Sequence, residues 1–197
     1  MLYKIAHTLQ SKMPWLWPLV EWGNGVLFKI RYGRKLTEGL SSVLAGYPDV
    51  REASEEDVES LALFFSTQPE EAFRYFKPHR FNGKDLIRLV KNPSFLMFVV
   101  EREGKVTGYF FLRSFFIGKA YLGKMVDYRM QGHGIGQKMC SCAMDIALLL
   151  GLRMYETISK ENLASLYSSQ KVLEVRVLEE MSNGYLYIED VRKRSEI

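Results

Sequence analysis

Hydrophobic and polar positions alternate in two distinct ways along the chain from residue 49 onward. The runs SFLMFVVE (94–101), KVTGYFFLRS (105–114) and 117–128 are apolar throughout or alternate with a period of two, and these patterns predict strands. Between residues 134 and 150, apolar side chains recur at spacings of three and four residues, which predicts a helix that Gly151 ends. The main part of the chain therefore mixes both kinds of element.

Further elements surround this central part. Ser54, with Asp57 three residues later, is typical of a helix N-cap and predicts a helix over residues 55–66. The turn Ser182-Asn183-Gly184 predicts a closing hairpin. The remaining predictions are helices over residues 69–75, 83–91 and 160–170, and strands over residues 49–54, 153–159, 171–180 and 184–191.

Residues 1–47 differ in character from residues 48–197, and we treat them as an N-terminal appendage to one larger domain. The appendage has six basic and two acidic side chains. In VEWGNGVLFKIRYG (20–33), alternating apolar positions follow the turn-forming Gly23-Asn24-Gly25, which predicts a β-hairpin. The appendage also holds all three tryptophans, Trp15, Trp17 and Trp22.

The composition of this appendage fits three alternative roles. The first is to cover an exposed sheet edge of the larger domain, and the second is to form a contact in a homodimer. In the third, its tryptophans and cations contact a membrane surface or a partner. We favour the covering role and treat membrane contact as the less favoured alternative.

Composition excludes several classes of protein. With 47% hydrophobic and 25% charged residues, the 197-residue chain resembles an ordinary globular domain, and a net charge of +4 is too small to indicate nucleic-acid binding. Cys140 and Cys142 point to different sides of a predicted helix and cannot bridge each other, which favours a reducing, cytoplasmic location. The sequence has no apolar run of membrane-spanning length. Its apolar start is not followed by a small-residue cleavage site, so we expect that start to be retained.

The stretch YRMQGHGIGQKMC (128–140) places three glycines at alternating positions between a predicted strand and the long predicted helix. A helix start offers unpaired N–H groups and a partial positive charge, and glycines let phosphate oxygens approach those groups closely. The spacing excludes a dinucleotide fingerprint, G-x-G-x-x-G, and a P-loop, which ends in G-K-[ST]. Gln131-x-x-Gly134-x-Gly136 therefore indicates another kind of diphosphate loop, or a tight turn without a ligand.

This spacing resembles the acetyl-CoA pyrophosphate loop of the GCN5-related N-acetyltransferases (GNAT), written [RQ]-x-x-G-x-[GA]. The string MVDYRMQGHGIG is similar to the family's V-x-P-x-x-Q-G-x-G-I-G, with Tyr128 in place of proline. Asn162 and Ser165 resemble its N-x-x-S helix motif, and the order of elements over residues 49–190, about three quarters of the chain, is also similar. The resemblance implies an α/β (α+β) fold with a central mixed, mostly antiparallel twisted sheet flanked by helices, preceded here by the hairpin-containing appendage.

The resemblance also implies how acetyl-CoA binds as co-substrate. Backbone groups of Met125 and Val126 would pair with pantetheine where two strands part, and Asn162 would position the thioester arm. Asn162 as a stabilising helix N-cap and His133 as a solvent-facing spacer are the plainer interpretations. The backbone amides that would hold the diphosphate belong to Gln131, Gly132, His133, Gly134, Ile135 and Gly136.

Acetyl transfer to an amine requires that the amine lose a proton and that the leaving thiolate gain one. The first candidate for the base is Glu156, on a strand beside the expected cleft. The second is Asp127, although an aspartate at the end of a strand is more typical of a structural residue. If the amine loses its proton to a chain of water molecules, neither carboxylate is needed as the base. Many members of the family have a tyrosine that acts as the general acid at the position where this chain has Ser169. Tyr167 lies two positions earlier, about 200° from Ser169 around a helix. We therefore predict Glu156 and Tyr167 as the catalytic residues, and no metal.

Together these features predict an acetyl-CoA-dependent N-acetyltransferase that transfers acetyl directly to a primary amine of a small molecule. Direct transfer needs no acyl-enzyme, so both cysteines are interpreted as core residues. Aromatic side chains in the expected acceptor region either stack on a sugar or nucleobase or simply pack, and an amino sugar or sugar nucleotide is the leading hypothesis. The alternative is a non-catalytic CoA-binding or interaction module with a membrane- or partner-docking N-terminal segment.

Overall fold

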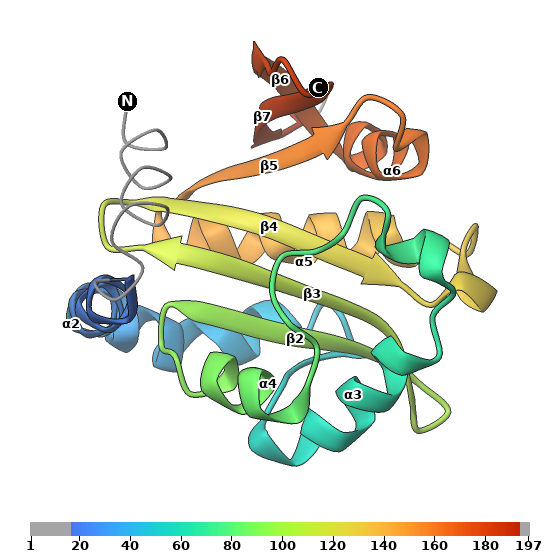
Figure 1. The fold of residues 1–197 in the computed structure, drawn as a ribbon. Helices are drawn as coiled ribbons and strands as arrows, with labels where there is room; N and C mark the ends of the chain where they lie inside the picture. The colour runs from blue at the N-terminus through green and yellow to red at the C-terminus, as the bar shows by residue number, and fades with distance from the viewer. Residues whose placement is uncertain (1–16, 194–197) are drawn as a thin grey trace.

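A seven-stranded sheet with the order β1-β2-β3-β4-β5-β7-β6 forms the centre of the protein (Figure 1). The computed structural model describes residues 17–193. The strands are β1 (Val50–Glu52), β2 (Phe95–Arg102), β3 (Lys105–Phe115), β4 (Lys119–Val126), β5 (Arg153–Ser159), β6 (Leu173–Glu180) and β7 (Tyr185–Arg192). The α-helices are α2 (Trp17–Leu44), α3 (Val58–Ser66), α4 (Gly83–Val90), α5 (Ile135–Leu150) and α6 (Leu163–Val172), and the 3-10 turns are η1 (Glu55–Asp57), η2 (Glu70–Phe73) and η3 (Tyr128–Met130).

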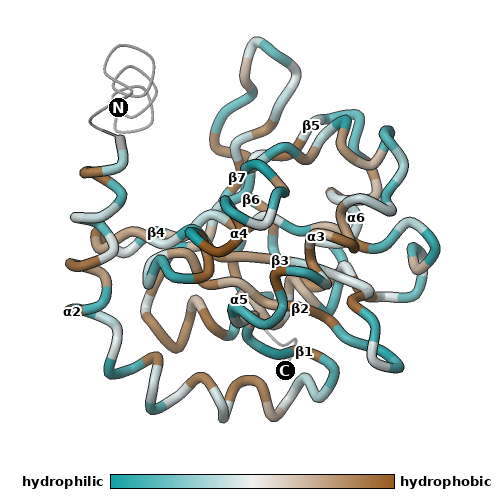
Figure 2. Tube along the Cα trace, turned by 60° about the horizontal axis from the view of Figure 1, so that its bottom comes forward, coloured by the Kyte–Doolittle hydropathy of each residue, from teal (hydrophilic) through white to brown (hydrophobic). Residues whose placement is uncertain are grey.

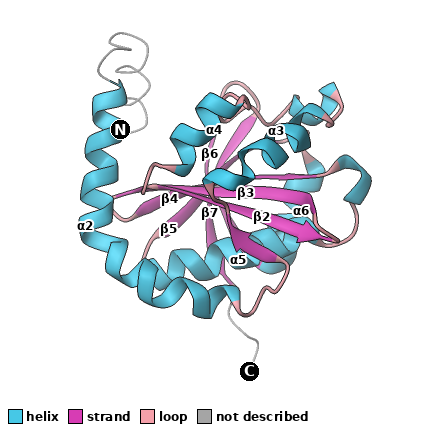
Figure 3. Ribbon diagram, turned by 90° about the horizontal axis from the view of Figure 1, so that it is seen from below, coloured by secondary structure: helices cyan, strands magenta, loops and turns pink. Residues whose placement is uncertain are grey.

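Helices cover both faces of the central part of the sheet, around β2 and β3 (Figure 3), whereas β6 is largely exposed. Phe98 and Phe110 belong to the core under α2 and α5, whereas Val99 and Tyr109 belong to the core under α3 and α4. All four side chains are fully buried, because neighbouring residues of a strand point to opposite faces and both faces are covered here. Burial on both sides explains why SFLMFVVE is a continuous apolar run rather than an alternating one.

The predicted α/β fold with a mixed, mostly antiparallel sheet and flanking helices is confirmed. β4 and β5 run parallel, and the other neighbouring strands are antiparallel. The predicted helix signals also act as expected, since Ser54 and Asp57 form a reciprocal capping box and Gly151 caps α5 with φ +69°. The closing hairpin around residues 182–184 joins β6 to β7.

The hairpin predicted in residues 20–33 is wrong, because this segment is part of the 28-residue helix α2. Its alternating apolar positions also contain a period of four: Phe28, Tyr32 and Leu40 are buried in the core with α5, and the intervening Leu36 packs against that core. Tertiary contacts also account for the turn-like residues. A Cβ on Gly25 would lie 3.1 Å from Asn92 Oδ1, and the Asn24 amide donates to Ser114 O at 2.9 Å and accepts from Phe116 N at 3.1 Å.

The inner face of α2 packs on α5 and on β3, an inner strand, so this segment covers one face of the sheet as a helix and does not cover a sheet edge as we expected. Trp15 lies outside the described residues. Within residues 17–193, none of the helices combines the length and the apolar composition that crossing a bilayer demands.

Candidate functional site

The strands β4 and β5 pair over only three residues and then part. The last pair is Tyr121 with Tyr155. Beyond it β4 stays paired with β3 as far as Val126, and β5 stays paired with β7 as far as Ser159. The edges of β4 and β5 that face each other therefore carry backbone groups that no longer pair across the gap.

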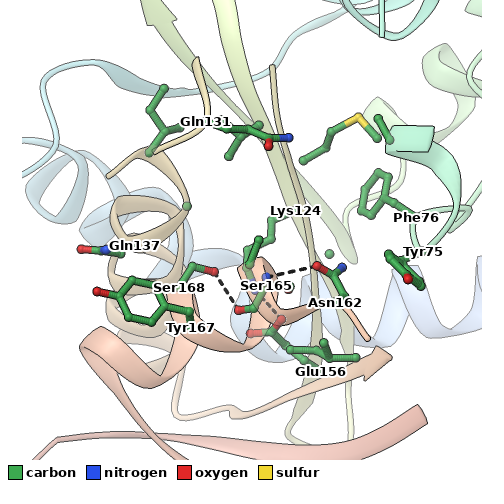
Figure 4. A pocket seen from close by; sticks show the side chains of 18 of the residues that line it. Tyr75, Phe76, Lys124, Gln131, Gln137, Glu156, Asn162, Ser165, Tyr167 and Ser168 are labelled. Carbon is green, nitrogen blue, oxygen red and sulfur yellow. Dashed lines mark hydrogen bonds and ion pairs between the residues drawn. The ribbon is translucent and has the colours of Figure 1, made fainter. Parts of the chain in front are cut away.

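A cavity of about 530 Å³ occupies this gap (Figure 4), within the usual range of small-molecule sites. Residues 122–126 of β4 and 156–159 of β5 form two of its walls. The loop after η3, the start of α5, one side of α6 and the η2 region complete it. The parted strands and the glycine loop, which are distant in the sequence, thus open into one space.

The glycine loop gives the cavity an end rich in N–H groups. Gly132 (φ +80°) and Gly134 (φ +76°) adopt the left-handed conformation that favours glycine, and Gly134 is the N-cap of α5. The N–H of Lys138 donates to Gly134 O at 3.0 Å, so the amides of residues 135–137 precede the bonding ladder of the helix. Residues 135–138 include no acidic side chain that would offset the positive end of the helix.

Close packing of α6 completes this cradle. A Cβ on Gly136 would lie 3.2 Å from Ser168 Cβ, so glycine lets the first turn of α5 approach α6 closely. By contrast, an added Cβ on Gly132 or Gly134 would meet nothing within 4 Å, which leaves open space above the amides. An anionic diphosphate fits the chemistry and the free space of this end of the cavity.

The structure places eight of the nine predicted cofactor residues in the cavity wall. His133 is the ninth; it is exposed, and its Nδ1 lies 2.9 Å from Gln131 O. Asn162 lines the cavity and also caps α6, because its Oδ1 accepts from Ser165 N at 3.2 Å. The residues in the wall are Met125, Val126, Gln131, Gly132, Gly134, Ile135, Gly136 and Asn162.

Glu156 belongs to a buried polar cluster at the base of the gap. Its carboxylate pairs with the Lys124 ammonium, and the two side chains are 4% and 7% exposed. Ser169 Oγ donates to Glu156 Oε1 at 2.8 Å and lies 3.1 Å from Lys124 Nζ. Burial disfavours the Lys124 ammonium, but the charge and hydrogen bond of Glu156 contribute to a net rise in its pKa.

Asp190 adds a second carboxyl to this cluster. It pairs with Met154, two residues from Glu156, so both carboxyls lie on one face of the sheet. Asp190 is 3% exposed, and neither of its oxygens has a hydrogen-bond partner among the described residues. Burial, reinforced by Glu156, raises the pKa of Asp190 to about 9, so the neutral acid predominates at pH 7.

The other candidate acids and bases occupy different surroundings. Tyr167 is 59% exposed on the rim near Gln137, on the side of the cavity away from Tyr75 (Figure 4). Asp127 accepts two hydrogen bonds from the Arg129 guanidinium, and these bonds help to lower the pKa of Asp127. Asp127 is therefore held as a structural ion pair.

Sequence reasoning missed Lys124 and Asp190. Each lies at an inward position of a strand, Lys124 in alternation with Leu122 and Asp190 in alternation with Ile188. The sequence did contain a signal, because each of these charged residues occupies the same face of its strand as a buried apolar residue. A charged side chain at such a position needs a partner of opposite charge or a hydrogen bond. The partner, however, came from another strand and could not be identified from local pattern.

Comparisons with known proteins agree with this architecture. The profile of the acetyltransferase (GNAT) family matches residues 55–170, more than half of the chain. The structure of yncA from Salmonella typhimurium with its cofactor acetyl-CoA is similar, with 20% identity, a TM-score of 0.61 and coverage of 75% of this chain and 95% of that one. An N-acetyltransferase from Staphylococcus aureus Mu50 has 20% identity, a TM-score of 0.60 and coverage of 73% and 96%. AAC(6')-Ib in complex with paromomycin and acetyl-CoA has 13% identity, a TM-score of 0.59 and coverage of 75% and 97%.

At these identities the likeness to solved structures concerns the fold. No curated protein sequence matches the chain.

Replacing Asp190 by Asn removes the titrating carboxyl from the buried cluster. The pKa of Asp190 is about 9 in the folded protein against 3.8 ordinarily, so the folded state binds an extra proton between these values and loses stability as pH rises through them. We compare the free energy of unfolding of Asp190→Asn with that of the parent. We expect this difference to favour the variant more at pH 8 than at pH 5, by on the order of 1–4 kcal/mol. Urea unfolding of both proteins at the two pH values measures this difference, and an equal effect at both would contradict it.

Proposed function

Because the chain belongs to the acetyltransferase (GNAT) family, whose members are N-acetyltransferases that use acetyl-CoA, we propose that it transfers acetyl directly to a primary amine of a small molecule. One observation carries the proposal: the amide-rich start of α5 and the gap between β4 and β5 open into the same cavity. An elongated co-substrate can therefore place an anionic group at the helix start and a reactive group in the gap.

In this proposal, the backbone of the glycine loop binds the diphosphate of acetyl-CoA. The amides of residues 131–136 supply the N–H groups, and the positive end of α5 adds a favourable field. Met125 and Val126 pair with the pantetheine arm along the open edge of β4, and Asn162 orients that arm from the start of α6. When bound, acetyl-CoA supplies an activated acetyl thioester.

The acceptor enters from the η2 side of the cavity. Glu71, Tyr75 and Phe76 line that side, so a carboxylate for an ammonium group and aromatic faces for a sugar ring lie together. Arg74 and Tyr75 both bond to Glu161 Oε2, at 2.6 Å and 3.0 Å, and so connect η2 to the start of α6. This size and chemistry favour an amino sugar or a sugar nucleotide, and the similar AAC(6')-Ib structure is a complex with paromomycin and acetyl-CoA.

Direct transfer is favoured because the cysteines are unsuited to forming an acyl-enzyme. Cys140 and Cys142 are fully buried in the core. Burial raises the pKa of both thiols, that of Cys142 to about 12, so neither is a thiolate at neutral pH.

We assign Glu156 as the base that accepts the proton lost by the acceptor amine, and Tyr167 as the acid that returns a proton to the departing thiolate. Lys124 and Ser169 fix the Glu156 carboxylate, whose oxygens can each accept a further hydrogen bond from a water molecule. Tyr167 reaches the cavity from the exposed rim, where its hydroxyl exchanges protons with solvent. The non-catalytic CoA-binding module remains the alternative that turnover measurements decide.

Glutamate at Gly134 tests the diphosphate cradle, with Gly184→Glu as its matched control. Both glycines have positive φ, +76° and +82°, and open space around an added Cβ, so the two substitutions cost similar backbone strain. Acetyl-CoA at about a hundred times its Kd should stabilise the parent and Gly184→Glu by roughly 2.7 kcal/mol in thermal unfolding. Gly134→Glu should lose this stabilisation, and an undiminished shift in that variant would contradict the assignment of the loop.

Removing the proposed base tests the chemistry. With amino sugars and sugar nucleotides as acceptors and thiol release as the assay, we expect Glu156→Gln to lower kcat by roughly 10²–10⁴-fold. Because this change leaves Lys124 buried without its anion, the double variant Lys124→Met/Glu156→Gln serves as a control that removes the unpaired charge. Recovery of parental kcat in the double variant would make Glu156 purely structural. Binding of acetyl-CoA without turnover of any primary amine would favour the non-catalytic module.

A further inference from the structure

The helix α2 has a second apolar face, which is exposed in the part of the structure that residues 17–193 form. Its inner face packs into the core, but positions at spacings of three and four residues on the outer face are also apolar. Trp22 is 67% exposed and Ile30 is 77% exposed, which is unusual for side chains of this size. The outer apolar face consists of Leu19, Val20, Trp22, Val26, Leu27 and Ile30.

The β3–β4 turn extends this outer apolar face. Phe116 and Ile117 are 38% and 44% exposed, and the Phe116 carbonyl accepts from Arg31 Nη1 at 2.8 Å. The N–H of Phe116 in the same turn donates to Oδ1 of Asn24, which lies one helical turn from Leu27. The apolar surface therefore runs from the helix onto the sheet end, and Figure 2 shows the hydrophobic positions along α2.

Positive charges border this surface. Lys29, Arg31, Arg34 and Lys35 are all exposed on α2. Glu21 is directed toward the domain, where it pairs with Arg113 at 2.9 Å, and Glu38 lies one turn beyond Arg34. Apolar side chains that include a tryptophan, flanked by cations, are typical of helices that lie in the interface of a membrane.

We propose that the outer face of α2, together with Phe116 and Ile117, docks the protein on a membrane surface that contains anionic lipids. Charge favours this occupant over a second copy of the chain. Two copies related by a two-fold axis would bring their own rows of cations together, whereas anionic headgroups complement those cations.

Docking at this surface leaves the proposed acetyl-CoA cavity free. The β3–β4 turn that touches α2 precedes the start of β4, while residues 122–126 at the far end of that strand line the cavity. In Figure 1, α2 and the start of α5 accordingly lie at opposite ends of β4.

Vesicle sedimentation of the full chain tests this proposal. We compare sucrose-loaded vesicles of phosphatidylcholine alone with vesicles that contain 30% phosphatidylglycerol, a proportion of roughly one anionic lipid in three. We expect at least about tenfold stronger partitioning to the anionic vesicles. Trp22→Gln/Ile30→Gln should reduce that partitioning at least about tenfold, and Lys29→Gln/Lys35→Gln should reduce it and weaken its dependence on salt.

Control substitutions outside the outer apolar face of α2 distinguish docking at this face from nonspecific adsorption to vesicles. Leu63→Gln alters another exposed leucine, 64% exposed on α3, and Lys77→Gln/Lys105→Gln removes two exposed cations elsewhere. These variants should partition like the parent, and circular dichroism should show all variants folded. Failure to bind either vesicle, equal binding by the α2 variants, or a dimer in sedimentation equilibrium that Trp22→Gln/Ile30→Gln abolishes would each overturn the proposal.

Discussion

The buried ion pair between Lys124 and Glu156 links β4 to β5 beyond the point at which their backbones stop pairing, and both of its residues belong to the wall of the cavity. After Tyr121 and Tyr155 the backbone ladder between β4 and β5 ends, and the next link between these strands is this side-chain pair. Lys124 and Glu156 therefore connect the two walls of the cavity that β4 and β5 form. Removing one partner would leave a buried charge, at a cost of about 3–5 kcal/mol.

Aromatic side chains pack around the point where β4 and β5 stop pairing. The Tyr155 ring lies 5.7 Å from that of Tyr121, in a tilted arrangement, and 5.4 Å from that of Tyr187, on which it stacks. On β4, a Cβ on Gly123 would lie 2.3 Å from the ring of Phe111, so glycine is needed for that ring to sit against the strand. A neutral Asp190 beside the pair then leaves one anion for one cation in this buried cluster.

Local patterns predicted the elements whose periods are unambiguous, such as α5 with its Gly151 cap and the strands from residue 94 to residue 126. The glycine spacing likewise predicted the loop at the cavity, because close approach to backbone amides restricts residue type over a few positions. Prediction failed where distant contacts decide. Asn24 and Gly25 suggest a turn locally, yet bonds to residues 114 and 116 and packing on residue 92 keep them helical. Lys124 could not be paired with Glu156 from sequence, since their separation of 32 residues is closed only by the parallel crossover.

In the proposed function, one ligand occupies both the amide cradle of α5 and the open edge of β4. Amide hydrogen exchange with and without saturating acetyl-CoA tests this arrangement, because exchange reports on the backbone groups themselves. We expect slower exchange, by about tenfold or more, in residues 123–126 and in residues 135–137 together, with the β6–β7 hairpin unchanged. Acetyl-CoA that binds but leaves exchange in either segment unaltered would contradict it.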